Sequence, residues 1–240
     1  MFLRFRILAL LVLFVAIANH AQSALIALVN STTANATFNT NFQAYIEGKG
    51  HTFVRNPSSY IGVNLVFNIR QAISGDLKSW VEGGGYMITE YSGLTNAGTA
   101  GLINYSDTGG SNAGTGGIPV TFTAAGIAKG LNTGLANPYN GGIAAEFFRN
   151  GIVLGSGVEI LATRGASLPA IVGSPTINGS GYVLGFAYDW GDAFTQTPPL
   201  TNTVQLIDNA LTLAAVPEPG TWGVLAVCIM GFVFNSRGRR

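Results

Sequence analysis

The sequence has little of what catalytic and metal sites are usually built from. Its 240 residues include one cysteine, Cys228, and two histidines, His20 and His51. One cysteine cannot form a disulfide within the chain, and neither residue type is numerous enough for a thiolate or histidine metal site. A Ser-His-Asp triad would have only His51 as its base, since His20 falls in an N-terminal leader, and His51 precedes an expected strand where a triad histidine would follow one. We therefore expect no metal, no cofactor and no triad.

Charged residues are also scarce, at 10% of the chain. Five of the 12 basic residues and one of the 11 acidic residues lie in segments 1–24 and 217–240, which leaves residues 25–216 near −3. A nucleic-acid-binding surface needs a basic stripe that neutralises phosphates, so no nucleic-acid partner is expected. The apolar content of 48% is typical of a folded chain, and 192 residues suffice for one substantial domain or two small ones.

The first 24 residues have the pattern of a secretory signal peptide. Arg4 and Arg6 precede an apolar run at 7–18, and Ala21 and Ser23 supply the small residues that signal peptidase requires. Cleavage there would begin the mature chain near Leu25. The alternative, a first permanent membrane helix, needs a longer apolar run than this one. Signal peptidase is therefore the first partner that the sequence predicts.

The C-terminal 25 residues, 216–240, hold three distinct pieces in a fixed order. Pro217-Glu218-Pro219 is stiff and extended, because each proline fixes its own φ and restricts the residue before it. The apolar run 222–234 follows; as a helix it is about 20 Å long, against about 30 Å for the hydrocarbon core of a bilayer. Arg237, Arg239 and Arg240 then favour a cytoplasmic C-terminus. The helix is marginal as a permanent anchor, so transient spanning of the inner membrane is expected.

This order of pieces resembles the PEP-CTERM sorting signals that exosortases recognise in Gram-negative bacteria. The resemblance implies that an exosortase processes the tail at the sorting motif Pro217, Glu218 and Pro219. It also implies an inner-membrane intermediate and a final location at the cell surface or in the extracellular matrix, within a polysaccharide layer. A C-terminal anchor that is never processed is the alternative.

Residues 25–90 alternate between two periodicities. Apolar runs at 25–29, 51–54, 65–69 and 86–90 predict strands, and Phe38, Phe42 and Ile46 mark the buried face of a helix that ends near Gly48. A second helix, with Leu77 and Val81 on its buried face, ends at 83–85, a glycine run that is no phosphate loop because it precedes a strand. Strands that alternate with helices predict an α/β domain with a mainly parallel sheet, in which 25–29, 65–69 and 86–90 lie next to one another or nearly so.

The second half of the domain is less regular. Residues 92–117 are rich in Gly, Ser, Thr, Asn and Ala without an apolar period, which predicts a long surface loop. Short strands are expected at 120–122, 144–148, 158–162, 170–172 and 182–188, and helices at 124–131 and around Val204 to Leu213.

Three segments resemble the flavodoxin-like domains of the class I glutamine amidotransferase and trehalose-utilisation (ThuA-like) superfamily. They are 65–70 (LVFNIR), 77–90 (LKSWVEGGGYMITE) and 181–186 (GYVLGF). The resemblance covers most of residues 25–214 and implies a layered sheet. The amidotransferases carry a catalytic cysteine at a strand-to-helix elbow, whereas this domain has no cysteine, and Tyr91-Ser92-Gly93 lacks the flanking glycine pattern of an elbow.

Carboxylates follow two of the expected strands. Glu90 ends one strand and Asp189 follows another, and ligands of open α/β sheets bind where parallel strands end. Asn30, Arg70 and Asp192 are the further candidates for ligand binding, and Glu90 and Asp189 could serve as acid and base in glycoside cleavage. The structural alternative is that Glu90 pairs with Arg70, and that Asp189 and Asp192 cap a turn at Gly191.

The sequence thus favours an exported surface or matrix protein whose α/β domain is a non-catalytic interaction domain. The alternative is a secreted carbohydrate-active hydrolase that uses Glu90 and Asp189. Convergence of Asn30, Arg70, Glu90 and Asp189 in one concave pocket would favour the hydrolase, and scattered side chains would favour the interaction protein.

Overall fold

The computed structural model describes residues 23–31, 35–112, 119–141 and 147–214, and residues 24–214 pack as one unit. Most of the expected signal peptide, the sorting motif Pro217-Glu218-Pro219 and the apolar run 222–234 lie outside the described residues. Within the part of the chain that is described, no helix is both long enough and apolar enough to cross a bilayer.

The first half of the domain alternates strands and helices. The elements are β1 (Leu25–Val29), α2 (Ala36–Gly48), β2 (Thr52–Arg55), β3 (Leu65–Ile69), α3 (Gly75–Glu82) and β4 (Tyr86–Glu90). Both helices begin at a side-chain cap: Asn35 Oδ1 accepts from the N–H groups of Thr37 and Phe38, and Ser74 Oγ accepts from the N–H of Leu77. The alternation expected from the two periodicities is therefore confirmed.

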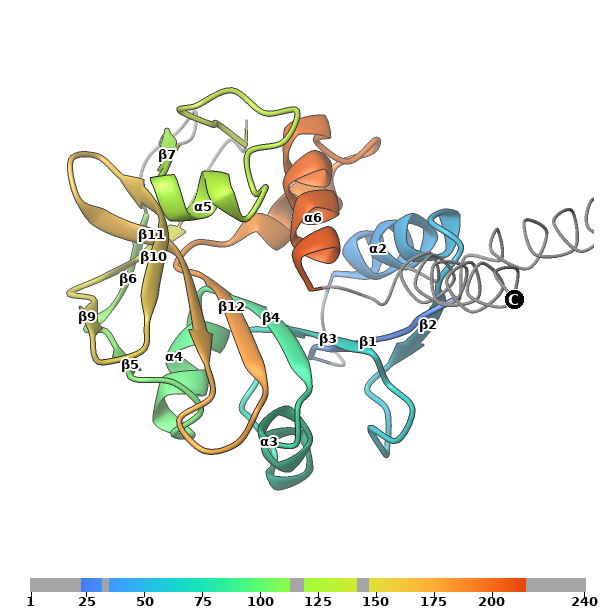
Figure 1. Cartoon of the computed structure of the whole chain (residues 1–240). Helices are drawn as coiled ribbons and strands as arrows, with labels where there is room; N and C mark the ends of the chain where they lie inside the picture. The colour runs from blue at the N-terminus through green and yellow to red at the C-terminus, as the bar shows by residue number, and fades with distance from the viewer. Residues whose placement is uncertain (1–22, 32–34, 113–118, 142–146, 215–240) are drawn as a thin grey trace, which may run out of the picture. The chain divides into compact units, whose positions relative to one another are not determined.

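One eight-stranded sheet forms the centre of the domain (Figure 1), in the order β2-β1-β3-β4-β12-β11-β10-β7. Its further strands are β7 (Val120–Phe122), β10 (Glu159–Arg164), β11 (Leu168–Pro175) and β12 (Tyr182–Phe186). The pairings from β2 to β12 are parallel, and β1, β3 and β4 are neighbours as predicted. The order of these five strands, 2-1-3-4-5 along the chain, is that of flavodoxin-like sheets. From β12 to β7 the sheet is antiparallel, so it is mixed.

The expected surface loop at 92–117 was wrong over the part that the structure describes, 92–112, which contains a helix, two short strands and the buried residues Leu102 and Ile103. Residues after β4 form helix α4 (Ser92–Thr99), which buries Leu94 and Ala97. This helix has no apolar stripe and packs instead through its glycines, which allow the backbone to approach its neighbours closely. A Cβ on Gly98, for example, would lie 2.0 Å from the carbonyl oxygen of Tyr105. The remaining elements are β5 (Tyr105–Ser106), β6 (Gly109–Asn112), α5 (Ala124–Ala128), β8 (Phe147–Asn150), β9 (Val153–Leu154), the 3₁₀ helix η1 (Trp190–Thr195) and α6 (Thr201–Leu213).

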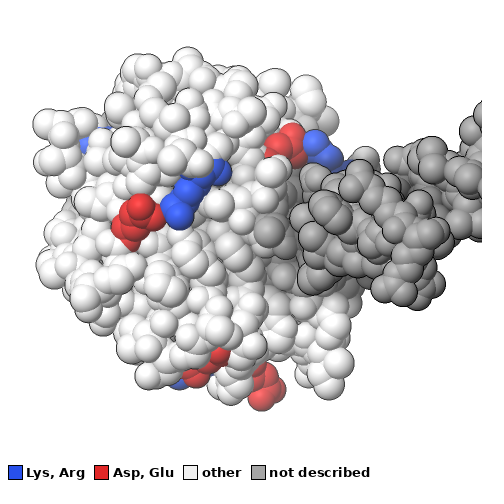
Figure 2. All heavy atoms as spheres, in the orientation of Figure 1, with Lys and Arg blue, Asp and Glu red and all other residues white. Residues whose placement is uncertain are grey.

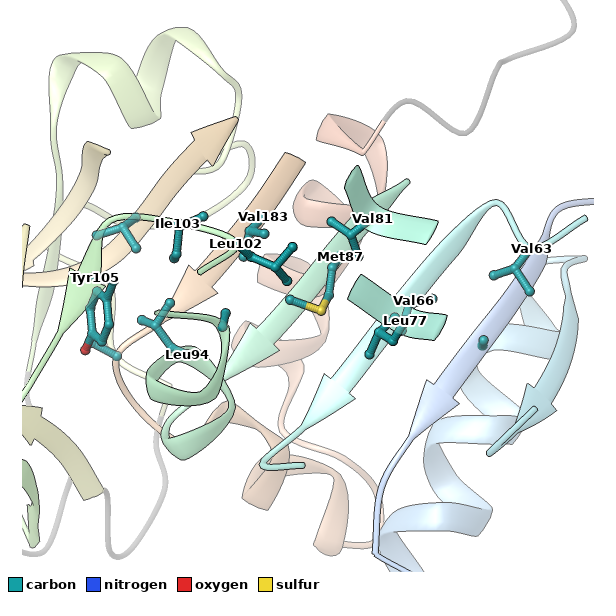
Figure 3. Close-up of a cluster of buried hydrophobic side chains, with 14 residues drawn as sticks. Val63, Val66, Leu77, Val81, Met87, Leu94, Leu102, Ile103, Tyr105 and Val183 are labelled. Carbon is teal, nitrogen blue, oxygen red and sulfur yellow. The ribbon is translucent and has the colours of Figure 1, made fainter. Parts of the chain in front are cut away.

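Helices cover both faces of the parallel half of the sheet. On one face Leu77 and Val81 of α3 and Leu94 of α4 pack with Met87 and Val183 from the strands (Figure 3). The other face is aromatic: α2 and η1 contribute Phe42, Trp190 and Phe194, and the ring centroids of Phe42 and Phe67 lie 5.0 Å apart. Burial on both faces makes β1, β3, β4 and β12 apolar, apart from Asn68, Thr89 and Glu90 near the carboxyl ends of β3 and β4. Polar side chains there need a separate explanation.

Candidate functional site

A cavity of about 220 Å³ opens beyond the carboxyl ends of β1 and β3. Within the sheet, β2 lies next to β1 on one side and β3 lies next to β1 on the other. The strand order therefore reverses between β1 and β3. Ligands of open α/β sheets bind at such a point. The lining residues combine amides, hydroxyls, carboxylates and two apolar side chains: Asn30, Ser31, Asn35, Phe38, Ile69, Arg70, Gln71, Glu90, Gly191, Asp192 and Thr195.

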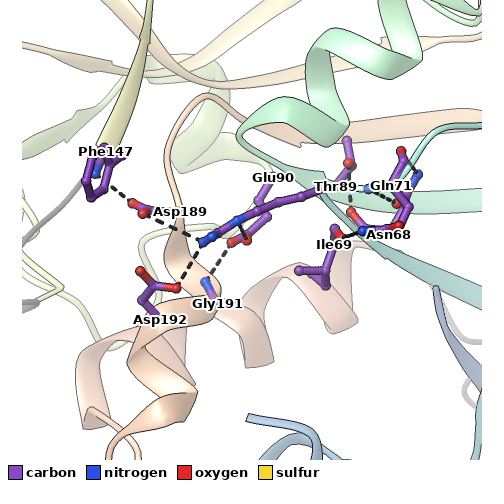
Figure 4. Close-up of polar contacts among 10 residues, drawn as sticks. Asn68, Ile69, Gln71, Thr89, Glu90, Phe147, Asp189, Gly191 and Asp192 are labelled. Atoms are coloured by element: carbon purple, nitrogen blue, oxygen red, sulfur yellow. Dashed lines mark hydrogen bonds and ion pairs between the residues drawn. The ribbon is translucent and has the colours of Figure 1, made fainter. Parts of the chain in front are cut away.

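Arg70 organises the polar wall of the cavity. It directly follows β3 with a φ of 61°, a left-handed conformation that is uncommon for a residue with a side chain. Its Nε donates to Glu90 Oε1 at 2.8 Å, and its Nη2 donates to Asp192 Oδ1 at 3.0 Å and lies 3.7 Å from Asp189 Oδ2. Figure 4 shows the three carboxylates around this guanidinium. One cation thus holds together three elements that are distant in the sequence.

Both carboxylate oxygens of Glu90 accept hydrogen bonds from the protein. Its side chain is 0% exposed; Oε1 accepts from Arg70, and Oε2 accepts from the Gly191 N–H at 2.6 Å. Burial raises the pKa of Glu90, while the Arg70 cation and the Gly191 N–H act in the opposite direction. The alternative in which Glu90 pairs with Arg70 is therefore what the structure contains.

Asp189 lies beside the guanidinium but does not line the cavity. Its Oδ1 accepts from the Phe147 N–H at 2.8 Å. Burial, with the neighbouring carboxylates Glu90 and Asp192, raises the pKa of Asp189 to about 8. Asp189 is the N-cap residue directly before η1, but its side chain makes no capping bond. The alternative in which Asp189 caps the turn at Gly191 is therefore wrong for this residue, because its carboxylate accepts from the first residue of β8 instead.

Asn30 lines the cavity and carries a buried acceptor. It follows β1 and is 5% exposed. Its Nδ2 donates to Asn39 Oδ1 at 2.5 Å, whereas its buried Oδ1 accepts no hydrogen bond from the residues described. An unmatched buried acceptor is costly unless a donor arrives from elsewhere. Asn30, Arg70, Glu90 and Asp192 therefore converge in one concave site, with Asp189 next to it.

The turn after β4 is an elbow, which the sequence analysis had rejected. Tyr91 has φ 46° and ψ −118° between the end of β4 and the start of α4, a strained strand-to-helix turn. Gly93 makes this turn possible, since a Cβ there would lie 2.3 Å from Thr89 Oγ1. Gly93, two residues after the elbow residue, was the available sequence signal.

The Tyr91 ring lies between two guanidinium groups. The central carbon of Arg149 is 4.8 Å from the ring centroid and that of Arg70 is 5.7 Å away. Arg149 also donates to Asp107 Oδ1 at 2.5 Å. Although burial opposes it, this bond and those from Thr95 and the Gly109 N–H hold the pKa of Asp107 below its ordinary value. Sequence reasoning missed this cluster because it placed Asp107 in a surface loop.

His51 is far from the elbow in the topology. It precedes β2, and its Nδ1 accepts from the Ala24 N–H at 3.4 Å, at the amino-terminal edge of the parallel strands. The elbow lies at the carboxyl edge. No histidine in the described part of the chain can therefore act as a base for Tyr91 or Ser92.

Comparison with known proteins gives the fold alone. No protein-family model and no curated protein matches the chain. Among solved structures, similarity is found to the exo-β-1,4-mannosidase Op5Man5 from Opitutaceae bacterium strain TAV5, with a TM-score of 0.51, 15% identity and 82% of this chain covered. SMU.1228c (TM-score 0.54) and PurLQS from Thermotoga maritima (TM-score 0.53) are each 12% identical over 80% of this chain.

The extent of these matches differs. The matched region is 37% of the mannosidase chain but 99% of each of the other two chains. At such low identity the shared feature is the α/β fold with its central sheet.

Proposed function

We propose that this chain is an exported cell-surface or extracellular-matrix protein, processed by signal peptidase and an exosortase, whose α/β domain binds extracellular polysaccharide without cleaving it. Export and sorting rest on the pattern of residues 1–24 and on Pro217-Glu218-Pro219 with the apolar run 222–234 and the terminal arginines. The binding role rests on the cavity beyond β1 and β3.

The observation that carries the non-catalytic assignment is the engagement of Glu90. A general base must have a free oxygen within reach of the proton that it removes. Glu90 instead accepts one hydrogen bond on each oxygen from the protein and is 0% exposed. The elbow adds to this, because it presents Tyr91 with no histidine nearby among the residues that the structure describes.

The cavity has the mixture of groups that a sugar requires. Phe38 and Ile69 offer apolar surface for C–H groups, and carboxylate and amide oxygens offer acceptors for hydroxyls. Charged side chains are few on the face of the domain in Figure 2, and basic and acidic groups lie side by side there. A neutral surface of this kind suits contact with a polysaccharide layer better than contact with a highly charged polymer.

Glycoside hydrolysis is the second candidate, and two observations favour it. Asn30, Arg70 and Glu90 line one cavity with Asp189 beside it, which is the convergence expected of a hydrolase. Burial and the neighbouring carboxylates raise the pKa of Asp189 to about 8, which favours the protonated form that a general acid needs, and Asp189 adjoins the cavity. Against this, hydrolysis needs two carboxyl groups that face the same glycosidic bond. Asp189 faces the Phe147 N–H and Arg70, and Glu90 faces Arg70 and Gly191.

A glycan array with the full chain in detergent micelles tests both candidates. We expect retention of a defined set of glycans without release of shorter products. An array without any retained glycan contradicts the binding role. Products that disappear in both Glu90→Gln and Asp189→Asn variants would assign the protein to the hydrolases.

A further inference from the structure

We infer that the cavity selects its sugar by charge, accepting neutral and amino sugars and rejecting acidic ones, with Asp192 as the selecting residue. The inference rests on the proposed function, since it names the class of sugar that the same cavity takes. It is carried by the charges that line the cavity, by the buried acceptor of Asn30 and by the size of the space.

The formal charges of the side chains that line the cavity sum to one negative charge. The charged lining residues are Arg70, Glu90 and Asp192, which gives one positive and two negative groups. Arg70 already bonds to both carboxylates, at 2.8 Å and 3.0 Å. Asp189, 3.7 Å from the same guanidinium, contributes no positive charge in either protonation state. Arg70, the one cation among these lining residues, is therefore already paired with carboxylates and has no free charge to offer an acidic sugar.

The residues around the cavity also have acceptors that need hydrogen-bond donors. Asn30 Oδ1 has no donor among the described residues, and each carboxylate oxygen can accept more than one hydrogen bond. Sugar hydroxyls and ammonium groups are donors, whereas an ionised carboxylate only accepts. A carboxylate placed here would leave the Asn30 oxygen unmatched and would face Asp192.

The space fits one sugar unit. Small-molecule pockets commonly measure about 300–1,000 Å³. The volume of about 220 Å³ lies below that range. The cavity therefore holds a single residue, such as the end of a glycan chain, and recognition concerns that residue's charge and hydroxyls.

Asp192 is the carboxylate that a ligand can reach. Its side chain is 39% exposed, whereas Glu90 is 0% exposed and bonded on both oxygens. An Asp192→Asn variant keeps an oxygen for Arg70 Nη2 and removes one negative charge. The wall then carries one positive and one negative group, and its repulsion of an anionic sugar falls.

Glucose, glucosamine and glucuronate provide the test, because they share one ring skeleton and differ in charge. Each is titrated at pH 7 into the full chain in detergent micelles, with affinity measured by ligand-observed NMR. We expect glucosamine and glucose to bind at least about tenfold more tightly than glucuronate, as repulsion between partly solvated charges a few ångströms apart implies. In Asp192→Asn the ratio of glucosamine to glucuronate affinity should fall by about tenfold.

Glu159→Gln is the matched control. Glu159 is on β10, its side chain is 47% exposed, and its partner is Lys129, so the variant removes a similarly exposed carboxylate away from the cavity. Its sugar ranking should equal that of the unchanged protein.

The outcomes separate the two levels of the proposal. Binding of no sugar overturns the saccharide role and this inference with it. Sugar binding in which glucuronate is equal or tightest, or in which Asp192→Asn leaves the ratio unchanged, overturns the charge selection while the saccharide role stands. The ranking in the unchanged protein decides the matter even where the variant is poorly folded.

Discussion

Arg70 Nε lies 2.8 Å from Glu90 Oε1 and links the ends of the neighbouring strands β3 and β4. The two partners differ in exposure: the Arg70 side chain is 35% exposed and that of Glu90 is 0% exposed. The guanidinium is therefore the solvent-facing cover of a buried carboxylate. Because removing one partner of a buried pair leaves an uncompensated charge, this pair should stabilise the edge of the sheet at which the cavity opens.

An Arg70→Met variant should lose about 3 kcal/mol of unfolding free energy, since Glu90 would remain buried without its cation. Urea denaturation of the variant and the unchanged protein measures the loss. The double variant Arg70→Met/Glu90→Gln is the control: with the buried charge gone as well, it should recover part of that loss. A double variant no more stable than Arg70→Met alone would show that the ion pair is not the cause.

The Asp189 carboxyl should make the domain less stable as pH rises. Its pKa is about 8 in the folded state, against an ordinary value of 3.8, so the folded state binds more protons than the unfolded state between those values. Stability is then greatest below about pH 4 for this group and falls until about pH 8. The raised pKa of Glu90 likewise makes the folded state less stable as pH rises. The lowered pKa of Asp107 makes the folded state less stable only as pH falls through the acid range.

Thermal unfolding between pH 5 and pH 8.5 checks this expectation. The melting temperature should decrease across that range in the unchanged protein and should decrease less in Asp189→Asn, whose amide oxygen can still accept from the Phe147 N–H. An equal pH slope in the two proteins would contradict the assignment to Asp189.

Gly93→Ala should destabilise the elbow. A Cβ at Gly93 would lie 2.3 Å from Thr89 Oγ1 and 3.1 Å from the backbone nitrogen of Arg70, and overpacking of this kind costs about 1–3 kcal/mol. Gly75→Ala on α3 is the matched control, because nothing lies within 4 Å of a Cβ there. We expect the control to be neutral or slightly stabilising. Comparable stability of the two variants in urea would mean that the elbow tolerates a side chain at Gly93.

The sequence predicted the parts of the fold that depend on local periodicity. Strands β1, β3 and β4 and helices α2 and α3 follow from short apolar runs and i, i+4 spacing, and the Arg70–Glu90 pair follows from two strand ends at the same edge. Helix α4 has no apolar stripe and depends on glycines that permit close contact, so composition alone indicated a loop. The strained φ of Tyr91 and the bond from the Phe147 N–H to Asp189, 42 residues apart, depend on tertiary packing and leave no local pattern.

The C-terminal tail should be cut near Pro217-Glu218-Pro219 after export. As a helix the run 222–234 would be about 20 Å long against a core of about 30 Å, which is short for a stable anchor, and we expect the two prolines to favour an extended, accessible segment before it. Replacing Pro217 and Pro219 by alanine should therefore hold the full-length protein in the inner membrane. Deletion of Arg237 to Arg240 should instead weaken retention during processing, because these charges oppose transfer of the C-terminus across the bilayer.

Mass spectrometry of the mature surface form measures the processing directly. In cells with an active exosortase, peptides from 222–240 should be absent from the surface form and present in the inner-membrane intermediate. Cells without the exosortase are the control, and in them the tail should remain attached. If 222–240 persists at high occupancy on the surface form in exosortase-containing cells, the tail is a plain anchor. The sorting assignment then fails, while the cavity and its sugar selectivity are unaffected, because they depend only on residues of the α/β domain.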